Sequence, residues 1–247
     1  MKMKVPRDRR AGGMIPILIG SLLFLILAVP SILPQTSSAD GPILFEENFS
    51  KKQNSDGTPG GWGLKQWSGS SAEIRLVPED GRRVLHLLSV DNSFGVYREF
   101  KFDVREYPIL RWRWKVTALP QNGDVRRKET DDQAAQIYVP FPRFPAWLNT
   151  RLVGYIWENK TPKGLKVTSR KFSSTRYIVL ESGAEKLGQW VEEERNVYED
   201  YKTLFGEEPP LAGGITLMID SDDTHSRAEG FFADIRIEKA KPAEAKP

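Results

Sequence analysis

Hydrophobic and polar residues alternate along much of the chain with a period of two, the pattern of a β-strand that buries one face. The clearest example is the segment 109–116, with the sequence ILRWRWKV. Its two tryptophans, Trp112 and Trp114, share their parity with Leu110 and Val116, whereas its three cations share the other parity. Because aromatic stripes of this kind usually pack in cores, we expect both tryptophans to be buried rather than to stack on sugar rings.

Similar short segments recur between residues 43 and 237, and turn-forming Gly, Pro, Asn and Asp residues separate them. Helical spacing of apolar residues is evident only in residues 185–205, which Gly206 follows. About ten strands and one helix predict an all-β fold, an antiparallel β-sandwich of the jelly-roll type with one peripheral helix at about 185–205. We expect residues 40–238 to form this single domain and residues 239–247 to be a disordered tail.

The first 39 residues have the pattern of a targeting segment. Five cations precede an apolar run from Met14 to Leu33, and the small residues Ser37, Ser38 and Ala39 follow it. We expect a signal peptide that is cleaved after Ala39. The alternative is an uncleaved membrane anchor, because the run is about as long as a bilayer-spanning helix. Both interpretations predict an exported, periplasmic domain, held at the inner membrane if the segment is retained.

Charge and cysteine content narrow the function classes. The chain has 36 Lys and Arg and 33 Asp and Glu, but the first 39 residues hold five of these cations and one of these acids. The remainder therefore carries 31 basic and 32 acidic residues, a balance that gives no support for a nucleic-acid partner. We expect membrane contact only through the N-terminal segment. The chain has no cysteine, which excludes disulfides, thiolate metal sites and a cysteine nucleophile.

The cations of the segment 109–116 require acids, water or an anionic ligand beside them. We hypothesise that Arg111 and Arg113 meet acids from neighbouring strands in a polar groove for a hydroxyl-rich or charged ligand. The alternative is a solvated sheet face with ordinary ion pairs. The candidate acids are Asp131, Asp132, Asp220, Asp222 and Asp223.

Tyr155, Trp157 and Glu158 lie at the end of another predicted strand, where side chains border surface loops. They are further candidates for ligand contact. A carboxylate pair for glycoside hydrolysis could also come from Glu158, Asp132 and Asp222, although no recognised hydrolase motif is present. The catalytic residues of such an enzyme therefore stay unknown.

Calcium is the one candidate cofactor. Asp220, Asp222 and Asp223 supply carboxylate oxygens from one loop, which hard cations prefer. An EF-hand is excluded because His225 and Phe231 stand where that motif needs glycine and glutamate. With only two histidines, His86 and His225, a three-histidine metal site is excluded as well.

Several segments carry a resemblance to a known family when they are taken together. They are Trp112–Lys115, Asp131–Asp132, Tyr155–Trp157, Trp190–Tyr201, Phe205–Gly206, Pro209–Pro210 and Asp220–Asp222. Their combination resembles a bacterial family known as domain of unknown function 3047. The resemblance spans about residues 45–237 and implies an exported, sandwich-like domain without an assigned activity. The opening 45–49 and the closing 233–235 are also similar to the first and last strands of many carbohydrate-binding jelly rolls, a likeness of fold only.

Three functions fit these patterns. The first is a non-catalytic binding module for a glycan or another polar envelope component. The second is a polysaccharide hydrolase with a carboxylate pair. The third is an envelope assembly factor that binds a protein partner through the amphipathic segment 187–204.

Overall fold

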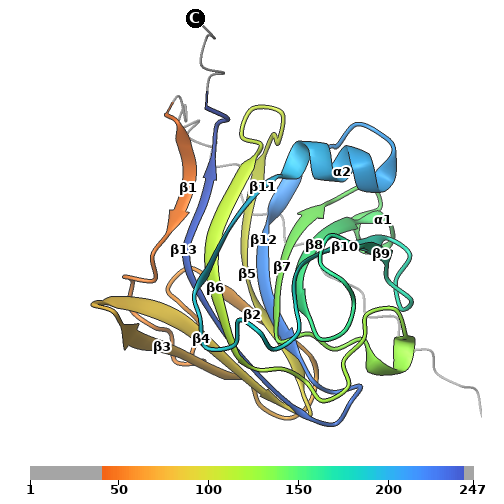
Figure 1. Cartoon of the computed structure of the whole chain (residues 1–247). Helices are drawn as coiled ribbons and strands as arrows, with labels where there is room; N and C mark the ends of the chain where they lie inside the picture. Colours follow the sequence, from red (N-terminus) through yellow and green to blue (C-terminus); the bar gives the residue numbers. More distant parts are fainter. Residues whose placement is uncertain (1–40, 242–247) are drawn as a thin grey trace, which may run out of the picture. The chain divides into compact units, whose positions relative to one another are not determined.

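The alternating segments of the sequence pair into two sheets that enclose one core (Figure 1). The computed structural model describes residues 41–241. Sheet 1 has the order β11 (Val191–Asn196), β6 (Ile109–Ala118), β13 (Arg227–Glu238), β4 (Arg82–Val90) and β3 (Glu73–Glu79), and β1 (Ile43–Glu47) pairs with β13. Sheet 2 has the order β2 (Gly63–Ser68), β5 (Ser93–Phe102), β12 (Ala212–Asp220), β7 (Ala135–Phe141), β8 (Arg151–Glu158), β10 (Thr175–Ser182) and β9 (Lys166–Thr168).

The predicted fold class is confirmed: this is an antiparallel β-sandwich of the jelly-roll type with a peripheral helix. Strand β6 pairs with β11 on one side and β13 on the other, so the segment that opens the sequence argument lies inside sheet 1. One pair of strands, β8 and β10, runs parallel. The connection between them carries β9 and two loops, which is enough chain to return to the same end of the sheet.

The tryptophans of β6 are buried as predicted. The rings of Trp112 and Trp114 meet edge to face, with 5.4 Å between their centroids. Tyr155 and Trp157 of the opposite sheet pack against them, at 5.4 and 6.0 Å. Four large aromatic side chains thus bridge the two sheets, and such burial supplies most of the stabilising free energy of a domain without disulfides.

The predicted helix at 185–205 is too long, and its first part is a strand. Residues 191–196 form β11 at the edge of sheet 1, and α2 spans only Val197–Phe205. The Asn196 side chain accepts a hydrogen bond from the Glu199 N–H and caps the helix, and Gly206 ends it with φ 71°. The sequence VEEERN has one apolar residue followed by five polar ones, so it shows neither a strand period nor a helix period, and pairing with β6 makes it a strand.

The apolar side of α2 is occupied by the domain itself. Val197, Tyr201 and Leu204 are buried in the main core, and the Asp200 carboxylate accepts hydrogen bonds from Tyr155 at 2.8 Å and Arg195 at 2.9 Å. These apolar residues are not available to a protein partner, which removes the structural basis of the proposed docking segment 187–204.

The outer face of sheet 2 carries a second, smaller apolar cluster. Tyr138, Ile156, Tyr177 and Val179 project from its strands, and Val125 covers them from the long loop between β6 and β7. This loop contains the short helix η1 (Lys128–Thr130), and the short helix α1 (Ala146–Asn149) lies between β7 and β8. The long polar loop of the sequence is therefore an ordered cover over sheet 2.

Within residues 41–241, no helix has the length and apolar character needed to cross a bilayer. The predicted signal peptide or anchor, residues 1–39, lies outside the described residues. So do residues 242–247 of the predicted tail.

Candidate functional site

Each cation on the outer face of β6 has an acidic partner from a neighbouring element. Arg111 forms ion pairs with Glu194 of β11 and with Glu238 of β13, the latter at 2.6 Å. The remaining pairs are Arg113 with Asp234 and Lys115 with Glu79. The expectation that these cations need acids is confirmed. The acids, however, come from β3, β11 and β13.

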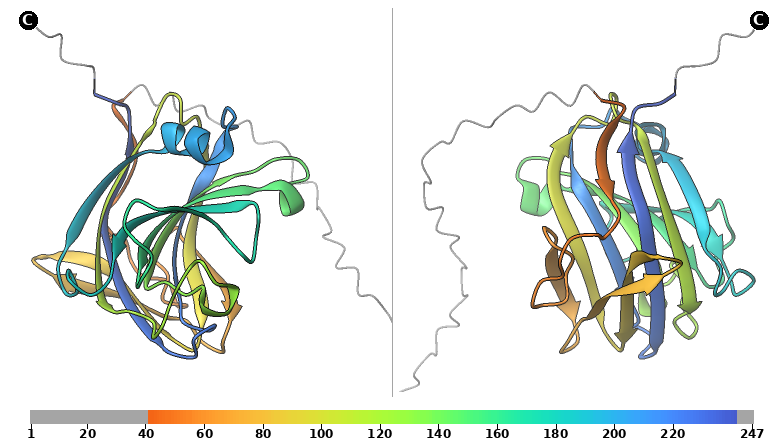
Figure 2. Two further views of the ribbon diagram at one scale, coloured as in Figure 1. Left: turned by 45° about the vertical axis from the view of Figure 1, so that its right-hand side comes forward. Right: turned by 90° about the vertical axis from the view of Figure 1, so that its left-hand side faces the viewer.

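A pocket of about 270 Å³ lies on this face beside Arg113. The hairpin of β3 and β4 curls over the outer face of sheet 1 (Figure 2, right), and its turn supplies one wall. The turn is tight because Asp80 and Gly81 both have positive φ values, 51° and 74°. The lining residues are Glu79, Asp80, Arg82, Val84, Arg113, Trp190 and Ala233, which we call the Trp190 pocket.

Arginines from two strands converge at the base of this pocket. Asp234 accepts one N–H from Arg82 at 2.7 Å and one from Arg113 at 3.2 Å, both on the same carboxylate oxygen. Asp234 sits at φ 51°, where the register of β13 against β6 is shifted. A guanidinium has five N–H donors, so each arginine retains donors for a ligand oxygen.

Trp190 forms the aromatic wall of the pocket. Its indole N–H donates to the Glu79 carboxylate at 3.0 Å, while Arg113 and Lys115 lie over its ring at 4.9 and 5.1 Å from the centroid. Burial acts to raise the Glu79 pKa, but the hydrogen bonds from Lys115 and Trp190 outweigh it and lower this pKa. Glu79 is thus an ionised hydrogen-bond acceptor at neutral pH.

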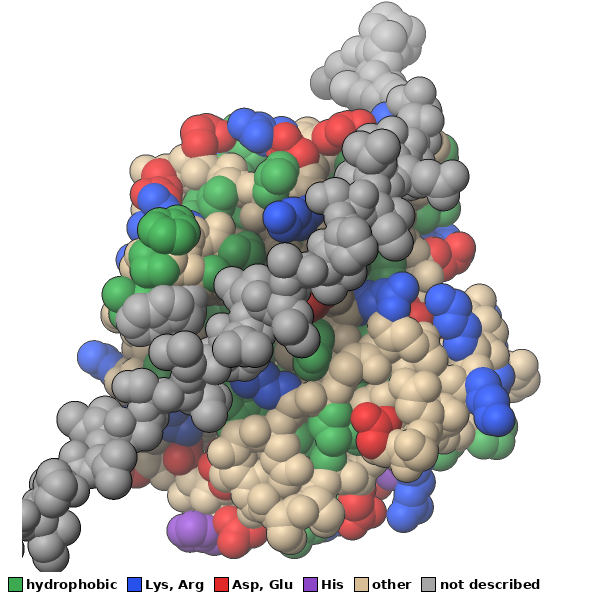
Figure 3. All heavy atoms as spheres, turned by 180° about the vertical axis from the view of Figure 1, so that it is seen from behind, with side chains coloured by type: hydrophobic (Ala, Val, Ile, Leu, Met, Phe, Trp, Pro, Cys, Tyr) green, Lys and Arg blue, Asp and Glu red, His purple; other side chains and the backbone are tan. Residues whose placement is uncertain are grey.

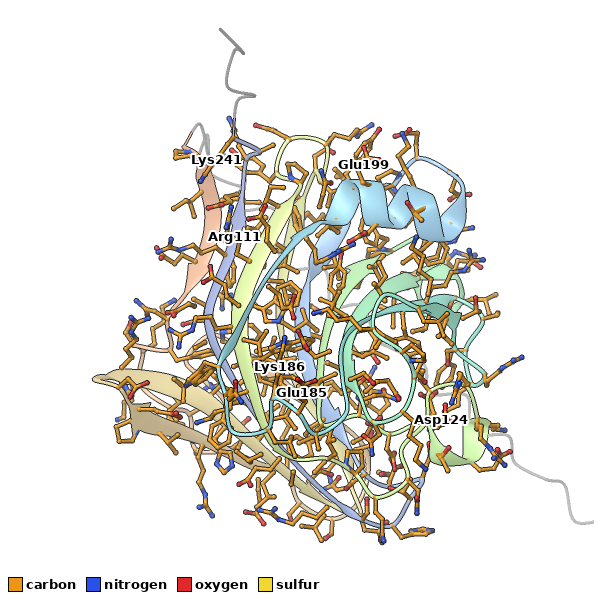
Figure 4. The ribbon with its side chains drawn as sticks, viewed as in Figure 1. Arg111, Asp124, Glu185, Lys186, Glu199 and Lys241 are labelled. Atoms are coloured by element: carbon orange, nitrogen blue, oxygen red, sulfur yellow. The ribbon has the colours of Figure 1, made fainter. Side chains whose placement is uncertain are left out.

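The predicted meeting of Arg111 and Arg113 with Asp131, Asp132, Asp220 and Asp222 is wrong. Figure 4 places Arg111 on the first sheet and Asp124, which belongs to the loop that leads to Asp131, on the opposite side of the view. The period-two pattern fixes which face of β6 carries its cations, but it gives no information on which loop lies over that face.

The acids form a separate cluster at one end of sheet 2. Asp220 accepts hydrogen bonds from the Gln133 N–H at 2.7 Å and the Gln136 side chain at 2.8 Å. Asp132 accepts the N–H groups of Asp223 and Thr224 and so closes the loop after β12. Asp223 is paired with Lys171.

Burial changes the ionisation of this cluster. Desolvation raises the pKa of Asp131 to about 6, and the hydrogen bond from Gln133 offsets only part of that effect. Desolvation and the neighbouring Asp132 together raise the Asp220 pKa well above its usual range. These carboxyls are held under the loops and do not face each other across an open groove.

Calcium binding stays a prediction, with a changed ligand set. Carboxylate oxygens of Asp132, Asp220 and Asp222 lie within 4.8 Å of one another, whereas Asp223 is engaged by Lys171. If the trio binds calcium, the ion will raise Tm relative to chelator, because a ligand that binds only the folded state stabilises it. Asp222→Asn is expected to abolish that rise and Asp223→Asn to retain it. An equal Tm in calcium and chelator would contradict the prediction.

Tyr155, Trp157 and Glu158 are not ligand contacts on the surface. All three are buried: Tyr155 and Trp157 face the core, and the Glu158 carboxylate accepts four backbone N–H groups, those of Val125, Asn159, Lys160 and Thr161. The strand does end at a loop, as expected, but that loop folds back over its last residue.

The pocket contains residues that sequence reasoning did not select. The sequence pattern places Trp190 in a helix, and it gives no functional signal for Glu79 and Arg82. One usable signal was the alternation of Trp190, Glu192 and Glu194, which places them on one face of an edge strand beside the cations of β6.

Comparison with protein-family models assigns the chain to a family. Residues 61–236 match the model of a family described as "Protein of unknown function (DUF3047)". The chain belongs to this family. The predicted resemblance is confirmed, and no curated protein matches the chain.

Solved structures with a similar fold include carbohydrate-binding modules. A family 11 module of a cellulosomal cellulase of Clostridium thermocellum has 8% identity and a TM-score of 0.44, with 82% of this chain and 96% of that chain covered. The CBM22-1 xylan-binding domain of Xyn10C from Paenibacillus barcinonensis has 13% identity and a TM-score of 0.40, with 82% and 97% covered. These likenesses concern the fold alone.

Proposed function

We propose that this member of the DUF3047 family is a non-catalytic binding module, and that a glycan or another hydroxyl-rich envelope component occupies the Trp190 pocket. The observation that carries the proposal is the lining of that pocket. One aromatic wall, two guanidiniums and an ionised carboxylate converge on a volume of about 270 Å³. Ligand sites typically combine apolar walls with a few convergent polar groups in this way.

The chemistry of the lining suits a sugar. The free N–H donors of Arg82 and Arg113 can donate to hydroxyl or carboxylate oxygens, and Glu79 can accept from a hydroxyl. The Trp190 ring offers a flat apolar surface for the C–H groups of a pyranose. The acids and cations around the pocket balance in number, which favours a ligand with little net charge.

Hydrolysis is the less supported function. A glycosidase needs one carboxyl that is protonated at working pH, together with a second that is ionised. In the pocket the Glu79 pKa is lowered, so Glu79 is a poor general acid. The acids with raised pKa values lie outside the pocket lining: Asp131, Asp132 and Asp220 are buried at one end of sheet 2, and Glu193 points inward from β11.

We propose the periplasm as the location, with inner-membrane anchoring if the N-terminal segment is retained. The support is the basic flank before Met14–Leu33 and the small residues up to Ala39. A binding module for an envelope glycan requires such a location.

The pocket is tested by a glycan-array screen followed by titration of the best ligand. We expect Trp190→Ala and Arg113→Ala each to weaken binding at least about tenfold, which corresponds to about 1.4 kcal/mol. Arg111→Ala is the matched control, because Arg111 lies two residues away on the same face of β6 but outside the pocket. Chelation of calcium is expected to leave binding unchanged.

Two results would contradict the proposal. One is the absence of any bound glycan. The other is an equal loss of affinity in the Arg111→Ala variant, which would point to a general effect of charge on this face.

A further inference from the structure

The connection between β7 and β8 carries the most exposed large apolar side chain of the described residues. Residues 142–150 form this segment, which we call the β7–β8 tip, and the short helix α1 lies at its end. Phe144 is 97% exposed and Leu148 is 61% exposed. Both views of Figure 2 show the hairpin standing out from the body of the sandwich.

Further apolar residues adjoin the base of the tip. Pro142 packs beside Gly213, where an added Cβ would come within 3.0 Å of its ring. Leu211, two residues before Gly213, is 48% exposed. From behind, hydrophobic side chains gather at the upper left, the side toward which the hairpin projects (Figure 3). Exposed apolar surface of this kind on a projecting element typically marks a contact site.

Cations outnumber acids at the base of the tip. Arg143 and Arg151 both form ion pairs with the single carboxylate of Glu207. Arg151 and Arg176 lie over the Phe205 ring, at 4.8 and 4.6 Å from its centroid. Two guanidiniums thus share the Glu207 carboxylate and a third lies on the neighbouring Phe205 ring, so the base of the tip keeps a positive charge.

In contrast to the expectation from the sequence that only the N-terminal segment contacts a membrane, we propose that the β7–β8 tip inserts into the surface of a membrane with anionic headgroups. The order of groups along the hairpin matches the order of layers in a bilayer: Phe144 and Leu148 at the end would enter the acyl region, and the arginines behind them would meet phosphates. A protein partner would not by itself explain why the hairpin has an apolar end and, behind it, a positively charged base. This inference is independent of the Trp190 pocket, which lies on sheet 1.

The N-terminal sequence agrees with a membrane as the partner. The apolar run Met14–Leu33, if retained, would tether the domain to the inner membrane through the short stretch before β1. A peripheral contact with two or three apolar side chains is weak alone and becomes effective when combined with basic residues or a tether. The tip therefore supplies a second, reversible contact.

The test is vesicle co-sedimentation of residues 39–247. This part of the chain forms one compact unit with both sheets and the whole core, and it lacks the apolar run that would bind lipid by itself. Vesicles of phosphatidylglycerol with phosphatidylethanolamine are compared with vesicles of phosphatidylcholine. We expect binding to the anionic vesicles and at least tenfold weaker binding to the neutral ones.

Variants distinguish vesicle binding through the tip from non-specific hydrophobic binding. Phe144→Ser with Leu148→Ser is expected to reduce binding to anionic vesicles at least tenfold, while the far-UV circular dichroism and Tm stay unchanged because both side chains are exposed. Phe172→Ser is the matched control, since Phe172 is 64% exposed in the loop between β9 and β10. It is expected to bind as the parent does.

Three results would overturn the proposal. They are absence of binding to anionic vesicles, parent-like binding by the double variant, and an equal loss in Phe172→Ser. Equal affinity for neutral and anionic vesicles would overturn the role given to the arginines.

Discussion

Replacing Glu158 with glutamine is expected to lower the free energy of unfolding by about 3–5 kcal/mol, because several buried N–H donors lose their acceptor. The carboxylate accepts the Val125 N–H on one oxygen at 2.9 Å. The other oxygen accepts three consecutive N–H groups, from Asn159 to Thr161, at 3.0–3.3 Å. A glutamine side chain keeps one of these oxygens and turns an NH₂ group toward donors.

Thermal unfolding measures this effect, and a fall in Tm of roughly 10 °C is expected for a domain of this size. Glu185→Gln is the control, because Glu185 is exposed in the loop before β11 (Figure 4) and should change stability by less than about 0.5 kcal/mol. If Glu158→Gln matched the parent in Tm, the carboxylate would not be the anchor of the β6–β7 loop.

The second large expected effect is that the titration of Glu193 makes the free energy of unfolding depend on pH. This side chain points inward from β11, and its Oε1 atom has no hydrogen-bond partner among the described residues. Burial raises its pKa to about 7, and the nearby Glu181 adds to the shift. Lys163 and Lys186 oppose it, although both are already paired with Glu181.

The direction of this pH dependence follows from the different protonation of Glu193 in the folded and unfolded states. Between the unfolded pKa of about 4.3 and the folded value, the folded protein holds a proton that the unfolded chain has released. Stability therefore falls as pH rises through this window and levels off above about pH 7. Glu193→Gln removes the titration, so we expect its stability relative to the parent to improve by about 1–3 kcal/mol between pH 4.5 and pH 8.

Urea unfolding at these two pH values measures the difference. Asp131, with a pKa of about 6, acts in the same direction and leaves part of the slope in the Glu193→Gln variant. Glu192→Gln is the matched control, because its side chain lies on the exposed face of the same strand. A pH slope in Glu193→Gln equal to that of the parent would contradict the raised pKa.

Much of the fold follows from the period-two pattern. It places the tryptophans of β6 in the core and their cations outside. It fails at residues 191–196, where five consecutive polar residues show no apolar period of either kind. Pairing with β6 is a long-range contact, which local propensity does not encode.

The candidate site is less predictable from the sequence than the fold. The candidate Arg113 lines the pocket, and its role as a ligand contact stays a prediction; its neighbours in the pocket meet it through the bend of the β3–β4 hairpin and a register shift in β13. Neither the bend of the hairpin nor the register shift can be predicted from the alternation of residues within one strand. Glu158 is the opposite case. Its position at the end of a strand suggests a ligand contact, but its carboxylate accepts hydrogen bonds from the backbone of two loops.

The inward carboxylate of Glu193 lies on β11, an edge strand of sheet 1, and this position affects how two molecules can associate. As the last strand of sheet 1, β11 presents one row of backbone N–H and C=O groups that no neighbouring strand uses. Such an edge invites pairing with the same edge of another molecule, and acids on both faces, one of them directed inward, oppose that pairing. Burial of the ionised Glu193 carboxylate destabilises the domain at neutral pH, and the same carboxylate disfavours edge-to-edge pairing of two copies.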